Sequence, residues 1–144
     1  MERRAFLGTV GSATVAGLAG CIGQRATADY DVGMGAKEFR PVELRVAPGT
    51  TVTWRNTNKQ GHSVTAYEDD IPEGADYFAS GGFDGEQTAR DAWSAGTDGT
   101  LFEGQTFEHT LEVPGTYRYF CIPHEVGGMI GTVVVTEDAA TETA

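Results

Sequence analysis

Lysine is scarce in this 144-residue chain, where only Lys37 and Lys59 occur against 21 acidic residues. The resulting formal net charge of −11 excludes the broad basic surface with which proteins bind nucleic acid. No nucleic-acid partner is therefore expected. An excess of carboxylates is also typical of proteins that work in a salt-rich medium, where these groups keep the chain hydrated. We expect a halophilic protein.

Cysteine is scarce as well, and the first of the two cysteines closes a segment that lacks strong hydrophobicity. A membrane-spanning helix requires about 20 strongly apolar residues, whereas residues 1–21 are rich in small ones and are predicted to be a signal peptide. Within it, RRAFL resembles a twin-arginine export signal, and LAGC resembles a lipobox that ends at Cys21. We expect a lipid on Cys21 to anchor the exported protein to the outer face of the cell membrane. Cys121 then has no disulfide partner.

The rest of the chain has few helix formers, and its many glycines favour turns between short strands. Apolar and polar residues alternate over residues 42–46 and 51–55, which is the period of a half-buried strand. Further strands are predicted within residues 61–68, 104–113, 115–121 and 131–137. The pattern predicts an all-β, Greek-key β-sandwich. We assign the sandwich to residues 31–136, with a flexible tether at 22–30 and a disordered acidic tail at 137–144.

Residues 67–103 depart from this pattern, because they form a long, acidic, glycine-rich insertion. Asp84 and Gln87 resemble a capping box, which predicts a short helix over residues 86–93. Aromatic side chains are expected to hold the insertion against the sandwich: Tyr77, Phe78, Phe83, Trp93 and Phe102.

The stretch CIPHEVGGM places three potential metal ligands close together: Cys121, His124 and Met129. Zinc sites favour cysteine and histidine without methionine, whereas copper accepts a thiolate, an imidazole and a thioether. A blue-copper site also needs a second histidine. His62 follows a glycine at the start of a predicted strand, from which it can reach a loop at the same end of the sandwich. His109 lies between charged and polar neighbours, and we expect it to be an exposed strand residue.

The stretch GTYRYFCIPHEVGGMIGTVVV, together with VAPGTTVTWRNTN and GHSV, resembles the plastocyanin family of the cupredoxins. The acidic composition, the lipobox and the twin-arginine signal add a resemblance to halocyanins, the membrane-anchored members of haloarchaea. The resemblance implies a cupredoxin-like sandwich and one copper ion in the plane of His62, Cys121 and His124. It also implies that Met129 is the distant axial ligand.

Two positions near this site need separate expectations. Ser63 stands where the family often has asparagine, so the side-chain bond between the two ligand loops is expected to change and to loosen the site. The backbone N–H of Ser63 can still donate to the Cys121 sulfur. Met34 is an alternative axial ligand, but we assign it a packing role near the site.

The resemblance implies a mononuclear blue (type 1) copper protein that carries electrons between donor and acceptor proteins of a membrane respiratory chain. It would cycle between Cu(I) and Cu(II) as a monomer. Three strong ligands leave no open position for a substrate, and we find no catalytic acid–base pair, so no enzymatic turnover is expected. Three alternatives stay open: a copper chaperone or storage module at the cell surface, a metal-free interaction domain that uses the insertion, and a subunit docked onto a respiratory enzyme.

Overall fold

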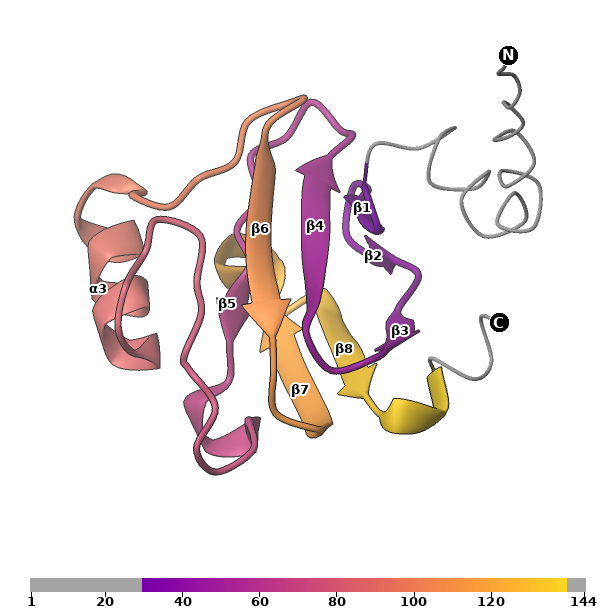
Figure 1. The fold of residues 1–144 in the computed structure, drawn as a ribbon. Helices are drawn as coiled ribbons and strands as arrows, with labels where there is room; N and C mark the ends of the chain where they lie inside the picture. Colours follow the sequence, from indigo (N-terminus) through magenta and orange to yellow (C-terminus); the bar gives the residue numbers. More distant parts are fainter. Residues whose placement is uncertain (1–29, 140–144) are drawn as a thin grey trace, which may run out of the picture.

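Residues 30–139 are described by the computed structural model, and they form two β-sheets that enclose a hydrophobic core (Figure 1). The strands are β1 (Val32–Met34), β2 (Phe39–Arg40), β3 (Glu43–Val46), β4 (Thr50–Asn56), β5 (Thr65–Ala66), β6 (Thr106–Leu111), β7 (Gly115–Phe120) and β8 (Ile130–Val135). Helical segments outside the sheets include η1 (Glu68–Asp70), α3 (Glu86–Gly96) and η2 (Ile122–His124). The expected all-β sandwich is therefore what the chain forms.

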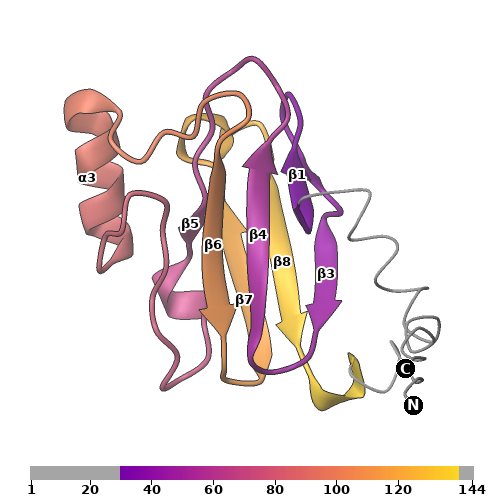
Figure 2. The ribbon, with the colours of Figure 1, turned by 45° about the horizontal axis from the view of Figure 1, so that its top comes forward.

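The strand order explains how distant segments reach one end of the molecule. One sheet has the order β2-β1-β4-β6 and the other β3-β8-β7-β5 (Figure 1 and Figure 2; β2 is labelled in Figure 1). Antiparallel pairing of β7 with β8 ends at Phe120 opposite Ile130, so residues 121–129 form the loop between these strands. β5 pairs with β7, with Thr65 opposite Phe120. The segment that precedes β5 therefore lies beside this loop.

The core lies between the sheets and contains large aromatic side chains. Trp54 from β4 and Tyr119 from β7 are fully buried and meet edge to face, with ring centroids 5.4 Å apart. Along β8, every second residue is buried, as the predicted alternation requires. The alternation is less complete near β3, where Val42 is 59 % exposed. β3 is an edge strand, which leaves Val42, just before it, uncovered.

Two strands, β1 and β2, are missing from the sequence prediction. They contain three and two residues, and all residues of β1 are buried, so neither shows a usable alternation. Conversely, the strand predicted within residues 61–68 is reduced to Thr65–Ala66. Such short pairings depend on neighbouring strands more than on local sequence.

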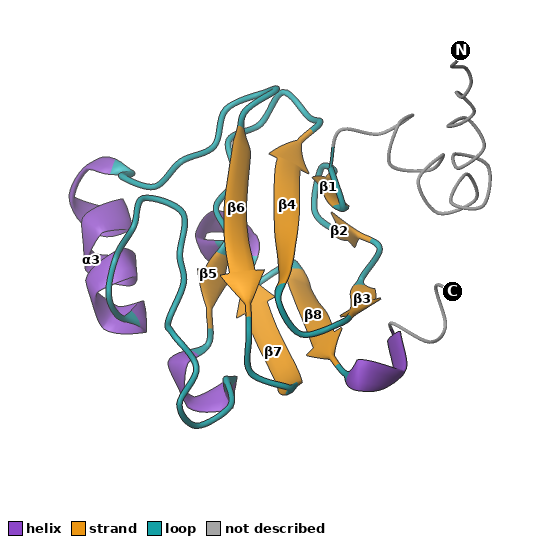
Figure 3. Ribbon diagram, in the orientation of Figure 1, coloured by secondary structure: helices purple, strands orange, loops and turns teal. Residues whose placement is uncertain are grey.

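The insertion contains the predicted helix, and α3 continues to Gly96, past the predicted end at residue 93 (Figure 3). The predicted capping box is wrong, because the N-cap residue is Gly85, which has no capping side chain. Instead, the backbone N–H of Glu86 donates to the Glu68 carboxylate over 3.0 Å, and the N–H of Glu68 donates to the Glu86 carboxylate over 2.9 Å. A distant carboxylate thus satisfies a donor at the start of the helix.

The aromatic residues of the insertion differ in how deeply they are buried. Phe78 is only 2 % exposed, and the hydroxyl of Tyr77 donates to the carbonyl of Ala66 over 2.8 Å. Phe83 and Trp93 are half-buried. Phe102 is 62 % exposed, so the expectation that it anchors the insertion is wrong.

The predicted signal peptide, Cys21 and residues 22–29 of the tether lie outside the described residues. In the predicted tail, residues 137–139 are helical and Ala139 is buried, whereas residues 140–144 are outside the description. Among the helices of residues 30–139, none has the length and apolar character needed to cross a membrane.

Candidate metal centre

Two loops supply the predicted ligands. Cys121 follows β7, His124 ends η2, and Met129 comes directly before β8. His62 lies just before β5, where its backbone N–H and carbonyl pair with Leu101 over 3.1 and 2.7 Å. Pairing of β5 with β7 then brings the histidine to the Cys121 end of the sheet.

The structure brings three of the four predicted ligands together. The Cys121 sulfur lies 3.5 Å from Nδ1 of His62 and 3.4 Å from Nδ1 of His124. The two imidazole ring centroids are 4.8 Å apart, and the potential ligand atoms all lie within 4.8 Å of one another. Both histidines thus present Nδ1 to the thiol, at distances that allow one ion to be shared.

Met129 belongs to the same loop and is fully buried. Its backbone is fixed from both sides, because its carbonyl accepts from the N–H of Cys121 and its N–H donates to the carbonyl of His124, each over 3.1 Å. The axial role of its thioether stays a prediction. Met34 is also fully buried and belongs to the same core cluster as Met129, which agrees with a packing role.

Burial sets the protonation of the site when no metal is bound. Desolvation, assisted by the neighbouring His124, lowers the pKa of His62 to about 4, and the Gly35 backbone opposes this shift. Burial and the charge of Lys37 also lower the pKa of His124. Burial raises the pKa of the Cys121 thiol to about 11, against hydrogen bonds from Ser63 and His124. Near pH 7 the site therefore offers two neutral imidazoles and a protonated thiol.

Ser63 links the two ligand loops in a way that the sequence comparison did not anticipate. Its backbone N–H donates to the Cys121 sulfur over 3.3 Å, as expected. Its hydroxyl oxygen accepts a hydrogen bond from the backbone N–H of Ile122 over 2.8 Å. A side chain shorter than asparagine thus still connects the two loops, and the expected loosening of the site stays a prediction.

The donor set suits copper, because a thiolate and imidazoles are ligands that this metal accepts readily. His62 and Cys121 are fully buried, whereas His124 is half-buried. Among these three residues, only His124 therefore presents an edge toward the surface. The site is therefore a buried thiol with one half-buried imidazole through which it reaches the surface.

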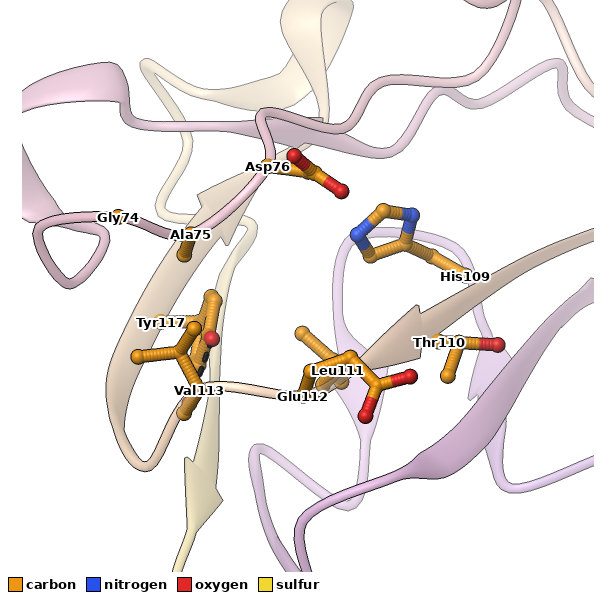
Figure 4. Close-up of a pocket in the computed structure, with 9 residues that line it drawn as sticks. All are labelled: Gly74, Ala75, Asp76, His109, Thr110, Leu111, Glu112, Val113 and Tyr117. Carbon is orange, nitrogen blue, oxygen red and sulfur yellow. Dashed lines mark hydrogen bonds between the residues drawn. The ribbon is translucent and has the colours of Figure 1, made fainter.

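His109 lies apart from this group, on β6. It stacks on Phe78 with ring centroids 4.7 Å apart, and it faces the carboxylate of Asp76 across a small pocket (Figure 4). Burial lowers its pKa, and the charge of Asp76 opposes the shift. It is half-buried, so the expectation of an exposed histidine is wrong, although its exclusion from the metal site agrees with the structure.

Sequence reasoning missed three residues that contact the segment around the ligands: Tyr67, Arg90 and Glu125. Tyr67 and Arg90 both hydrogen-bond to the Glu125 carboxylate, from positions 58 and 35 residues earlier in the chain. No local spacing joins such distant residues. The only available signal was a charged residue, Glu125, directly after a predicted ligand.

Comparison with known proteins also indicates a copper site. Residues 26–136 match the family described as copper binding proteins, plastocyanin/azurin family. The chain is 35 % identical to the chloroplastic plastocyanin of Hordeum vulgare over 142 residues, which cover 94 % of this chain and 82 % of the relative. It is 34 % identical to the plastocyanin of Scenedesmus fuscus over 101 residues, covering 70 % of this chain and 89 % of the relative.

Solved structures show the same fold. Oxidised plastocyanin from Dryopteris crassirhizoma superimposes with a TM-score of 0.51 at 26 % identity, covering 73 % of this chain and 98 % of that one. An oxidised amicyanin variant gives a TM-score of 0.52 at 27 % identity, covering 73 % of this chain and 79 % of that one. These matches and the His62–Cys121–His124 group, which is suited to one copper ion, agree. The chain belongs to the plastocyanin/azurin family of copper-binding proteins.

Proposed function

We propose that this protein is a membrane-anchored mobile carrier that moves single electrons between redox proteins of a respiratory chain. The observation that carries the proposal is the His62–Cys121–His124 group, in which the thiol is buried and one imidazole is half-buried. A copper ion held there supplies a one-electron Cu(I)/Cu(II) couple. The hydrogen bonds around Cys121 and His124 would hold the ligand atoms in place in both oxidation states.

The proposed attachment to the membrane is supported by the N-terminal sequence. The twin-arginine-like RRAFL and the lipobox-like LAGC occur together in residues 1–21. Lipid on Cys21 would hold the protein at the outer face of the cell membrane, and residues 22–30 would act as a tether. A tethered monomer can then exchange between partners along the membrane.

The proposed docking surface surrounds the exposed edge of His124. Val126, two residues further on, is completely exposed. His124 itself lines a groove without a single charged side chain, whose other lining residues are Gln60, Gly61, Trp93, Thr97, Thr100, Phe102 and Pro123. Small and largely apolar contacts of this kind suit brief redox encounters.

The acidic remainder of the surface then serves solubility in salt. At 1 M ionic strength the Debye length is only about 3 Å, so distant charges steer partners very little. The uncharged groove at His124 still attracts an apolar partner surface at this ionic strength, because salt does not screen apolar contacts.

The visible absorption of residues 22–144, which lack the anchoring Cys21, loaded with Cu(II), tests this proposal. We expect an intense blue thiolate-to-copper band that disappears on reduction and returns on oxidation. The Cys121→Ser variant should bind copper without that band. Copper that exchanges readily with a chelator but does not cycle reversibly would contradict the carrier function and favour the copper-chaperone alternative.

A further inference from the structure

The side chain of Arg90 joins helix α3 of the insertion to the ligand loop. Its two terminal nitrogens, Nη1 and Nη2, donate to the two carboxylate oxygens of Glu125 over 2.8 and 3.1 Å. The same guanidinium lies over the ring of Phe120, with its central carbon 4.3 Å from the ring centroid. One rigid, planar group thus makes a paired hydrogen bond and a cation–π contact together.

The two partners of Arg90, Phe120 and Glu125, lie directly beside metal ligands in the sequence. Phe120 immediately precedes Cys121, and Glu125 immediately follows His124. Arg90 therefore contacts both residues that border the short segment containing two of the ligands. Because the guanidinium is planar, it fixes the distance and the orientation between these two borders.

The surroundings fix Arg90 and Glu125 in turn. Glu86, one helical turn before Arg90, accepts from Nε of the guanidinium over 2.9 Å, and the Tyr67 hydroxyl donates to Glu125 over 2.7 Å. The Tyr67 ring also stacks on Phe120, with centroids 4.4 Å apart. The side chains of Arg90 and Glu125 are only 30 % and 26 % exposed, so their pair is better shielded than an ordinary surface ion pair.

We propose that Arg90 is a positioning residue for the metal centre, and that the insertion at residues 67–103 serves to hold the ligand segment from outside. The two hydrogen bonds to Glu125 keep the backbone after His124 in place. The contact with Phe120 does the same for the backbone before Cys121. The inference rests on the copper site, and only its reduction-potential readout depends on the proposed electron-carrier function.

The alternative is that Arg90 merely attaches α3 to the sandwich. The two roles differ in what loss of the side chain changes. A positioning residue alters the exchange of backbone amides in residues 121–129 and the release of copper. An attachment residue alters the helix and the overall stability, and leaves the loop and the ion as they were.

Arg118 provides a matched control on the same side of the molecule. It pairs with Asp70 over 3.2 Å and lies over the Tyr67 ring at 5.5 Å. It therefore makes the same kinds of contact as Arg90 but one step further out, because its ring partner Tyr67, and not Arg118 itself, contacts Glu125 and Phe120. Arg118→Gln removes an equivalent charge without touching Glu125.

The experiment compares wild type with Arg90→Gln, Arg90→Lys, Glu125→Gln, the Arg90→Gln/Glu125→Gln double variant and Arg118→Gln. Hydrogen exchange of residues 121–129 is measured in the copper-free proteins, and the copper-loaded proteins are mixed with a Cu(II) chelator. We expect Arg90→Gln and Glu125→Gln to accelerate both loop exchange and copper release by about three- to tenfold. The double variant should match the single ones, because the two side chains act as a unit.

Arg90→Lys keeps the charge but loses the planar fork, so it should behave like Arg90→Gln. Wild-type rates in Arg90→Gln or in Arg90→Lys would overturn the inference, as would equal acceleration in Arg118→Gln. The reduction potential is measured in parallel and should shift only in the Arg90 and Glu125 variants. If wild type does not cycle reversibly, the carrier proposal fails, whereas loop exchange and copper release still decide the role of Arg90.

Discussion

The hydroxyl oxygen of Ser63 accepts a hydrogen bond from the backbone N–H of Ile122 over 2.8 Å, although the two residues are 59 positions apart. Ser63 follows the ligand His62, and Ile122 follows the ligand Cys121. One small side chain therefore joins the two ligand loops directly beside the thiol. The same residue donates its backbone N–H to the Cys121 sulfur.

Ser63→Ala should destabilise the copper-free protein by about 1 kcal/mol, because the N–H of Ile122 loses its partner in a partly buried position. Urea unfolding measures this change. Ser94→Ala removes a hydroxyl from an exposed position on α3 and should change stability by less than about 0.5 kcal/mol. Equal effects of the two substitutions would show that the link between the loops contributes nothing to stability.

Copper uptake should release one proton per ion near pH 7. The thiol of Cys121, with a pKa of about 11, carries its proton until the metal displaces it, whereas His62, with a pKa of about 4, is already neutral. Apparent affinity for copper should therefore rise with pH between about 7 and 10. Calorimetry in buffers of different ionisation enthalpy counts the protons. Cys121→Ser should release none, and proton release from that variant would contradict the assignment.

Val126→Asp should slow electron self-exchange between copies of the protein at least about threefold, since a carboxylate loses hydration when two apolar faces meet. The blue absorption should stay unchanged. The exchange rate is measured by NMR line broadening in about 1 M salt, where long-range repulsion is screened. Val42→Asp is the control, because Val42 is also exposed but lies just before β3, whereas Val126 belongs to the ligand loop and is two residues from His124. A similar rate loss in both variants, or a lost blue band, would contradict docking at this face.

His109→Gln should weaken the pH dependence of stability on the acid side. Burial lowers the pKa of His109 below its ordinary value of 6.5, so the unfolded chain binds a proton more readily than the folded one. The contribution of His109 to the stability of wild type is therefore fully present above pH 6.5 and is lost as the pH falls below that value. Urea unfolding of copper-free wild type and variant at pH 7.5 and 5.5 gives the comparison. An equal loss in both chains would show that His109 does not contribute.

The sequence already contained most of the information about the ligands and the sandwich. Cys121, His124 and Met129 lie in one loop between two well-patterned strands, so their proximity follows from local spacing. His62 was a harder prediction, because a histidine elsewhere in the chain had to be placed at the same end of the sandwich. The pairing of β5 with β7 brings it there. Local patterns failed for β1, whose residues are all buried, and for the capping of α3, which depends on Glu68.

The sequence by itself determined which atoms are available to a metal, since the thiol and the imidazole of Cys121 and His124 are fixed by a short segment. Only the tertiary structure decided how those atoms are held and protonated. Burial, which depends on the packing of both sheets, raises the pKa of Cys121 and lowers that of His62. Arg90 and Glu125 are 35 positions apart in the sequence, and only the folded insertion brings them into contact. Interactions between near neighbours can be recognised in a sequence, whereas those between distant residues are formed by the strand pairing and packing of the whole fold.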